Sequence, residues 1–142
     1  LKKSYSVCDE TDGKRFLMMG YDGNIYIVDR LMTFIKVSNN NLSCDNFVFD
    51  GELVNDKSDT TKQYYMIFDV FAINKKVVKD IPNHEYRLST ITNMFPVQIG
   101  SLNVQVKRFY MASSIATCIQ NTQRLPYETD GYIFTPIKRK IF

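Results

Sequence analysis

The sequence has little of what metal centres and nucleophilic triads require. Its 142 residues include three cysteines and one histidine. Cys8, Cys44 and Cys118 lie far apart, without a CxxC pair or a nearby histidine, so the ligand spacing of a zinc site is absent. His84 has no partners for a catalytic triad close to it in the sequence. We expect reduced thiols and a histidine in a turn or at a helix start.

Long apolar runs are also missing. No stretch approaches the roughly 20 apolar residues that a membrane-spanning helix needs, and no basic segment followed by an apolar one opens the chain. The sequence therefore predicts an intracellular protein that does not contact membranes. Its net charge of +3 permits anionic ligands but does not require them.

The composition is that of an ordinary globular protein, with 44% hydrophobic and 23% charged residues. A chain of this length forms one domain that buries roughly 70% of its unfolded surface. No linker, repeat or low-complexity segment divides it, so residues 1–142 are expected to form a single domain.

Short runs of β-branched and aromatic residues predict strands in both halves of the chain. These runs are Ile25–Val28, Phe34–Val37, Phe47–Val54, Tyr64–Phe71, Leu102–Val106 and Tyr132–Phe134. Apolar residues at intervals of three and four predict one short helix from Glu85 through Phe95, and a second is expected from Met111 to Gln120. The pattern favours an α+β domain built around antiparallel sheet.

Five short motifs combine acidic, basic and aromatic residues with turns. They are Glu10-Thr11-Asp12-Gly13-Lys14-Arg15, Val28-Asp29-Arg30, Asp50-Gly51-Glu52, Phe68-Asp69 and Asp130-Gly131-Tyr132-Ile133-Phe134-Thr135-Pro136. Each alone is weak, because Asp-Gly is a common turn signal. Their order and spacing together resemble the nucleotidyltransferase domain of mRNA capping enzymes, which is related to the ATP-dependent polynucleotide ligases. The last motif is closer to the capping branch than to the ligases.

This resemblance implies a covalent nucleotidyltransferase fold and a two-step reaction. A lysine amine attacks the α-phosphate of GTP and releases pyrophosphate, and GMP then passes to the diphosphate 5′ end of RNA. Mg²⁺ or Mn²⁺ accompanies GTP and is held by few protein oxygens plus the phosphates. The partners implied are GTP, an RNA 5′ end and other capping domains or subunits. The location implied is the nucleus, or the cytoplasm if the protein is viral.

The resemblance also assigns roles to individual residues. Arg15 and Arg30 would contact ribose and phosphates, and Glu52 would hold the ribose hydroxyls or a metal-bound water. Phe68 would stack on the guanine, and Lys107 would donate to the guanine oxygen. The metal ligands would be Glu52 and Asp130. Without the resemblance, Phe68 reads as a core residue, Lys107 as a surface lysine and Asp130 as a hairpin aspartate.

One residue departs from the pattern at its chemical centre. Glu10 stands where the nucleophilic lysine is expected. A carboxylate is anionic at neutral pH, so it repels the triphosphate, and any acyl phosphate that it formed would be labile. We expect that lysyl-GMP does not form at Glu10.

The end of the chain departs as well. The family's last motif is a Lys-x-Lys strand that contacts the α-phosphate and is followed by an OB-fold domain. Lys138-Arg139-Lys140 comes too soon after Pro136 to be that strand and is expected to be a solvated tail. The domain is therefore expected to be incomplete at its C-terminus, without the OB domain. Replacing Glu10 by lysine is expected to restore activity only with those C-terminal parts.

Three functions remain open from the sequence. The first is a capping guanylyltransferase domain that is inactive as written. The second is a non-catalytic module that keeps the fold to bind a nucleotide, RNA or a protein partner. The third is a ligase-type adenylyltransferase, which the last motif disfavours.

Overall fold

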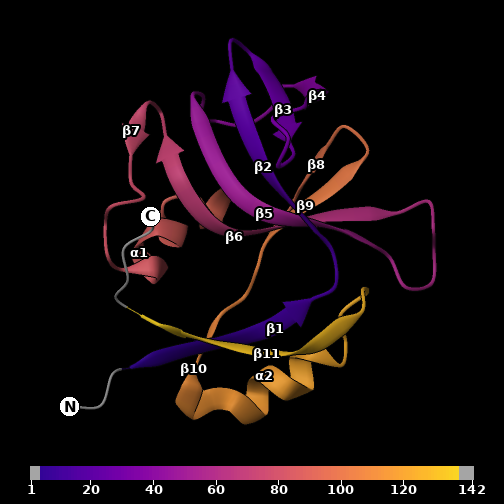
Figure 1. The fold of residues 1–142 in the computed structure, drawn as a ribbon, viewed down its shortest axis with the longest axis vertical. Helices are drawn as coiled ribbons and strands as arrows, with labels where there is room; N and C mark the ends of the chain where they lie inside the picture. Colours follow the sequence, from indigo (N-terminus) through magenta and orange to yellow (C-terminus); the bar gives the residue numbers. More distant parts are fainter. Residues whose placement is uncertain (1–3, 138–142) are drawn as a thin grey trace.

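Two β-sheets and two short helices make up the computed structural model, which describes residues 4–137 (Figure 1). The larger sheet contains β2 (Lys14–Tyr21), β3 (Asn24–Val28), β4 (Phe34–Asn39), β5 (Phe47–Asn55), β6 (Gln63–Ile73), β7 (Lys76–Val77), β8 (Val97–Ile99) and β9 (Leu102–Val106). Its strand order is β4-β3-β2-β5-β6-β9-β8, and β7 pairs with β6 outside this path. The smaller sheet contains β1 (Tyr5–Thr11), β10 (Tyr110–Met111) and β11 (Thr129–Pro136), in the order β10-β1-β11.

All the strands expected from the sequence are confirmed. The run at 64–71 lies within β6, an 11-residue strand between β5 and β9 in the larger sheet. The expected antiparallel pairing holds throughout both sheets except between β6 and β9, which pair in parallel. The connection between these two strands contains α1 (His84–Ser89), as a parallel crossover requires.

One face of the larger sheet carries the main hydrophobic core. Phe47 and Phe49 stack with ring centroids 4.3 Å apart, and both are almost completely buried. The buried Tyr65 reaches across this layer, and its hydroxyl donates to the carbonyl oxygen of Phe16 at 2.7 Å. Successive side chains of a strand point to opposite faces of the sheet. The residues that pack in the core therefore determine which residues point to the opposite face.

The helix expected over 85–95 is shorter than the periodicity indicated. Helix α1 ends at Ser89, and a 3-10 helix (Thr92–Met94) follows. The hydroxyls of Thr90 and Thr92 donate to the carbonyls of Arg87 and Leu88, which a continuing helix would use. These side-chain bonds end the helix early.

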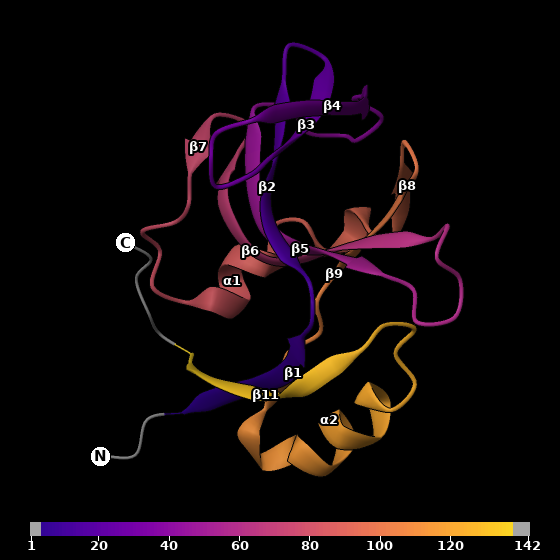
Figure 2. The same ribbon diagram turned by 45° about the vertical axis from the view of Figure 1, so that its right-hand side comes forward.

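The helix expected over 111–120 begins later than predicted. A 3-10 helix (Ala112–Ser114) precedes α2 (Ile115–Thr122). Figure 2 shows α2 beneath the smaller sheet, on the side of β1 and β11 that faces away from the larger sheet. Cys118 is fully buried in this layer.

The smaller sheet lies beside the larger one, and the β1–β2 turn joins the two sheets (Figures 1 and 2). Asp12 and Gly13 form this turn, where a Cβ on Gly13 would come within 2.6 Å of the Leu53 carbonyl oxygen. Only glycine allows this close approach. Within residues 4–137, no helix is long and apolar enough to cross a membrane.

Candidate nucleotide site

A cavity of about 500 Å³ opens between the two sheets. The larger sheet contributes mainly acidic, basic and aromatic side chains, and the smaller sheet contributes Cys8, Ile133 and Thr135. The other lining residues are Arg15, Asp50, Glu52, Phe68, Asp69, Phe71, His84, Arg87, Lys107 and Phe109. The structure therefore brings Arg15, Glu52, Phe68 and Lys107 to one cavity from distant parts of the chain.

Arg15 is held by a bidentate bond to Asp50. Its Nε donates to one carboxylate oxygen at 2.8 Å and its Nη2 to the other at 2.7 Å. Burial raises the pKa of Asp50, and the Arg15 guanidinium counteracts that rise. The Arg15 side chain is 57% exposed, whereas that of Asp50 is 5% exposed. The pair thus presents a fixed, accessible guanidinium at the cavity wall.

Glu52 lies next to Arg15 on the same face of the sheet, since the two residues are paired across β2 and β5. Its Oε2 is buried and has no hydrogen-bond partner among the described residues. Burial raises the pKa of Glu52, Lys107 lowers it, and the carboxylates of Asp9, Asp12 and Glu10 raise it further. An orphaned carboxylate oxygen of this kind is suited to a ligand that brings hydroxyl donors or a cation.

Lys107 directly follows the last residue of β9 in the larger sheet, and its side chain reaches β1 of the smaller sheet. Its backbone N–H donates to the Ile67 carbonyl, and its ammonium donates to the Thr11 hydroxyl at 2.6 Å. The same ammonium lies 3.6 Å from Asp9, and the side chain is 6% exposed. The expectation of a plain surface lysine is wrong, because this lysine is buried among acids at the foot of the cavity.

Phe68 lies on the cavity wall and is half-buried, so the reading of it as a core phenylalanine is wrong. Its carbonyl accepts a hydrogen bond of 2.6 Å from Nε2 of His84, the first residue of α1. The His84 ring meets the Phe109 ring edge to face, with centroids 4.5 Å apart. The histidine expected at a helix start is found there, and it anchors the strand that carries Phe68.

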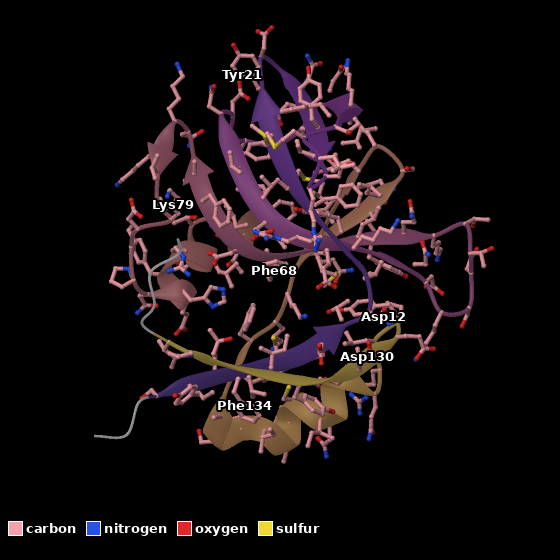
Figure 3. The ribbon with its side chains drawn as sticks, in the orientation of Figure 1. Asp12, Tyr21, Phe68, Lys79, Asp130 and Phe134 are labelled. Carbon is pink, nitrogen blue, oxygen red and sulfur yellow. The ribbon has the colours of Figure 1, made fainter. Side chains whose placement is uncertain are left out.

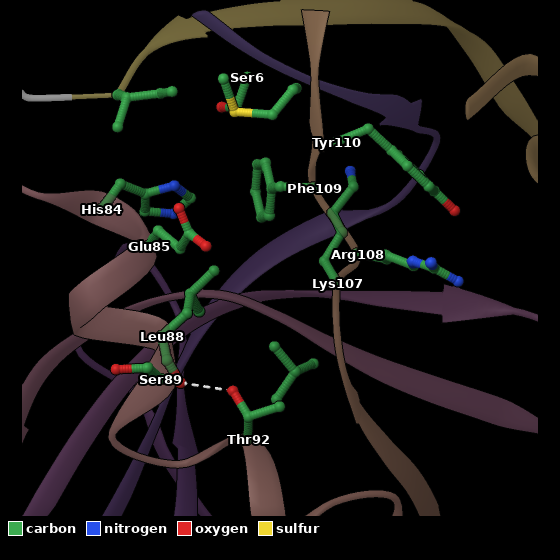
Figure 4. A pocket seen from close by; sticks show the side chains of 13 residues that line it. Ser6, His84, Glu85, Leu88, Ser89, Thr92, Lys107, Arg108, Phe109 and Tyr110 are labelled. Carbon is green, nitrogen blue, oxygen red and sulfur yellow. Dashed lines mark hydrogen bonds between the residues drawn. The ribbon is translucent and has the colours of Figure 1, made fainter. Parts of the chain in front are cut away.

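A second cavity of about 520 Å³ adjoins the first and shares His84, Lys107 and Phe109 with it. Figure 4 shows Phe109 in the middle of this second cavity, between His84 and Tyr110. Arg108 stacks over the Tyr110 ring at 4.8 Å. His84 and Phe109 therefore line both cavities.

A buried ion pair fixes α1 to β6 at the end of the cavity. Arg87 donates through Nε and Nη2 to Asp69 at 2.9 and 3.1 Å, and its side chain is 2% exposed. Because Asp69 follows Phe68 directly, this bond also restrains the segment that carries the aromatic ring.

Three expected site residues lie outside the lining of this cavity. Glu10 and Asp130 are exposed on neighbouring strands, β1 and β11. The Glu10 carboxylate lies 3.8 Å from where a Cβ on Gly131 would be. The backbone N–H of Asp12 donates to the carbonyl of Glu128 at 3.3 Å, which places the β1–β2 turn beside the segment that leads to Asp130 (both aspartates are labelled in Figure 3). Arg30 is exposed in the turn after β3.

The sequence predicted Glu52 and Asp130 as ligands of a divalent cation. Among residues 4–137, no group of three or more His, Cys, Asp or Glu side chains has the arrangement of a metal site. The orphaned oxygen of Glu52 fits an ion that takes few protein oxygens and completes its shell with phosphates. Of the two predicted ligands, Glu52 lines the cavity, whereas Asp130 lies outside its lining.

Sequence reasoning missed Asp50, His84, Arg87 and Phe109 as parts of the site. Asp50 had a usable signal, because residues two apart on a strand face the same way, and this places Asp50 with Glu52. The other three come from a helix and a connecting segment, and only the crossover brings them to the cavity. The three cysteines are free, as expected, and all three are buried; burial raises the pKa of Cys8 to about 11.

Replacing Glu52 by glutamine should stabilise the chain at neutral pH. The raised pKa of Glu52 means that the folded state binds its proton more tightly than the unfolded state does, so its ionisation costs stability as the pH rises. We expect Glu52→Gln to add about 1 kcal/mol to the free energy of unfolding at pH 7. The gain should shrink towards pH 4, where the unfolded state is also protonated. Urea titrations of both proteins at the two pH values measure this, and a loss of stability at pH 7 would contradict it.

Comparison with known proteins agrees with the geometry. The family model of the mRNA capping enzyme catalytic domain matches residues 1–142. The capping enzyme subunit alpha of Yarrowia lipolytica is 26% identical over 94% of this chain, and that of Kluyveromyces lactis is 24% identical over 97%. A mycobacterial DNA ligase D solved with ATP and MES superposes over 96% of this chain and 50% of its own, with a TM-score of 0.67 and 14% identity.

These matches differ in what they establish. The ligase shares the fold alone, because its sequence identity is low. The chain spans only 41% and 37% of the lengths of the two fungal relatives. The family model, in contrast, matches the chain throughout. The chain therefore belongs to the mRNA capping enzyme catalytic domain family.

Proposed function

We propose that this chain is a guanylyltransferase-type domain of mRNA 5′ capping that holds GTP between its two sheets but does not form the covalent GMP intermediate. The observation that carries the proposal is the convergence of Arg15, Glu52, Phe68 and Lys107 on one cavity. Glu10, at the position of the attacking lysine, gives the reason for the missing step.

The cavity offers what a purine nucleotide requires. Phe68 supplies an aromatic face, and Ile133 lines the same cavity from the smaller sheet, so a planar base could lie between the two. Lys107 supplies a buried donor at the foot of the cavity, where a guanine carbonyl oxygen would accept. Arg15, fixed by Asp50, would meet the ribose or a phosphate.

The chemistry would stop at binding. The reaction of this family needs an amine with a free lone pair. The amine attacks the α-phosphorus of GTP, and the bond to pyrophosphate, the leaving group, breaks. Glu10 has no amine and carries a negative charge among Asp9, Asp12 and Glu52. Mg²⁺ or Mn²⁺, bound with GTP and held by Glu52 and Asp130, would neutralise phosphate charge. A nucleotide-binding module without covalent chemistry is the second candidate, and Glu10 is the observation that favours it.

The names of the relatives support a proposal about the partners and the cellular location of this chain. Their names describe one subunit of a capping enzyme, so this chain would act with other capping domains or subunits and with RNA 5′ ends. Such a role would place it inside the cell, in the nucleus or, for a virus, in the cytoplasm.

Isothermal titration with GTP and ATP, each with Mg²⁺, tests the proposal. We expect GTP to bind with a dissociation constant above about 1 µM, because no lysine at position 10 meets the α-phosphate, and ATP to bind more weakly still. Phe68→Ala should weaken GTP binding about tenfold through the loss of stacking. Phe134→Ala is the control, since Phe134 is 52% exposed and does not line the cavity. Equal effects of the two changes, or sub-micromolar GTP binding, would contradict the proposal.

A further inference from the structure

The face of the larger sheet that lines the cavity continues beyond it. In an antiparallel sheet, residues directly opposite one another point to the same side. Asp50, a lining residue, is opposite Leu17, which is opposite Val28, and Val28 is opposite Phe34. One row of side chains therefore runs from the cavity to the edge strand β4.

A second row runs beside the first. Val48 is opposite Met19, Met19 is opposite Tyr26, and Tyr26 is opposite Lys36. Val48, Met19 and Tyr26 are half-buried, and Lys36 is exposed. Among the described residues, these apolar side chains belong to neither of the buried clusters that form the core. They form a partly exposed apolar surface, in which Val28 of the first row is the buried member.

Figures 1 and 2 agree that neither helix lies over β2, β3 or β4, since α1 is beside β6 and α2 is beneath the smaller sheet. At the far end of the two rows, the rings of Tyr26 and Phe34 meet edge to face, with centroids 6.3 Å apart and planes at 77°. Phe34 is 52% exposed. A phenylalanine in this setting presents its aromatic surface to solvent next to a second ring.

Cations border the two rows. Arg15 lines the cavity two residues before Leu17 on β2, so its side chain is on the same face as the two rows. Lys36 ends the second row, and the exposed Arg30 lies in the turn that joins β3 to β4. Within the part of the chain that the structure describes, neither Arg30 nor Lys36 has a carboxylate within 4.0 Å. Asp29, the nearest acid in sequence, accepts from the backbone N–H groups of Leu31 and Thr33.

We propose that this surface, formed by Leu17, Met19, Tyr26, Phe34, Lys36 and Arg30, holds the first nucleotides of single-stranded RNA that enters the site. The proposal rests on the proposed function, because it names where the RNA acceptor lies. Aromatic rings on an open sheet, bordered by arginine and lysine, bind single strands by stacking and phosphate contacts without reading sequence. Continuity with the cavity would bring the RNA 5′ phosphates towards Arg15.

Fluorescence anisotropy with a 10-nucleotide RNA that has a 5′-diphosphate and a 3′ label tests the proposal. We expect Phe34→Ala and Tyr26→Ala each to weaken binding about tenfold, since one stacking partner is lost. Tyr86→Ala is the matched control, because Tyr86 on α1 is also 52% exposed but lies outside this surface. Lys36→Ala should reduce the slope of affinity against salt concentration by about one, whereas Lys76→Ala on β7 should leave it unchanged.

Two further variants separate stacking from plain hydrophobic contact and from misfolding. Phe34→Tyr keeps the aromatic face and should bind RNA as the unchanged chain does. Phe34→Leu keeps apolar bulk without the ring and should bind as weakly as Phe34→Ala. Retained RNA binding by Phe34→Leu, equal losses in Tyr86→Ala, or no RNA binding by the unchanged chain would each overturn the proposal.

GTP titration of the same variants separates this proposal from the proposed function. Phe34→Ala and Tyr26→Ala should bind GTP as the unchanged chain does, because neither residue lines the cavity. If GTP binding depends on Phe68 while RNA binding ignores Phe34 and Tyr26, this surface is wrong and the nucleotide site stands. If RNA binding depends on Phe34 while GTP does not bind, the surface stands and the nucleotide site is wrong.

Discussion

Incubation of this chain with GTP labelled at the α-phosphate and Mn²⁺ should leave no label on the protein after denaturing electrophoresis. Glu10 offers a carboxylate where an amine is needed, and its charge repels the phosphate that it would have to approach. Burial among acids also gives Lys107 no route to replace the missing amine, since its ammonium donates to Thr11 beside Asp9. Relative to an active enzyme, we expect covalent labelling to be lost completely.

Glu10→Lys supplies the positive counterpart. We expect this variant to take up label from GTP and none from ATP when it is expressed together with the sequence that its reading frame encodes on either side of residues 1–142. Glu10→Gln removes the charge without adding an amine, and it should remain unlabelled. This variant distinguishes the lack of a nucleophile from the repulsion between Glu10 and the phosphates. A stable, acid-resistant GMP adduct on the unchanged chain would contradict the expectation. Label from ATP would instead support the ligase-type alternative.

Asp69→Ala should lower the free energy of unfolding by about 3–5 kcal/mol, because it leaves the Arg87 guanidinium buried without its carboxylate. Arg87 is 2% exposed, so its charge depends on protein partners for compensation. The pair also ties α1 to the strand that carries Phe68, so nucleotide binding should weaken together with stability.

Urea unfolding measures this effect, and the chain offers an exposed pair as control. Lys79 and Asp80 lie 3.9 Å apart with side chains 45% and 71% exposed. Asp80→Ala should therefore change stability by less than about 0.5 kcal/mol. A loss below about 1 kcal/mol in Asp69→Ala would mean that the buried pair is not needed to hold α1 in place.

Six strands, β3, β4, β5, β6, β9 and β11, could be predicted because their residues signal both propensity and periodicity, whereas β1, β2, β7, β8 and β10 were not predicted. The run at 64–71 combines β-branched and aromatic residues with enough length for a central strand, and β6 is such a strand. The helices were less predictable, since local side-chain bonds override apolar spacing. Thr90 and Thr92 end α1 by bonding to carbonyls that the periodic pattern assigns to the helix.

The site was predictable only where a motif signalled it. Arg15, Glu52 and Phe68 belong to the motifs, Lys107 was assigned by the family resemblance, and all four line one cavity. His84 and Phe109 could not be found in this way, because a lone histidine and a phenylalanine between strands carry no pattern. Their place depends on the crossover from β6 to β9, a long-range feature that no short window of sequence contains. The expected basic tail at Lys138-Arg139-Lys140 lies outside the described residues.

A crystal structure of this chain with GTP and Mn²⁺ would show whether the nucleotide binds between the two sheets. We expect the guanine ring to lie against Phe68 in the cavity there. The guanine carbonyl oxygen should face Lys107, and the intact triphosphate of GTP should extend towards Glu10. A nucleotide bound on another surface, or one in this cavity with its base away from both Phe68 and Lys107, would contradict it.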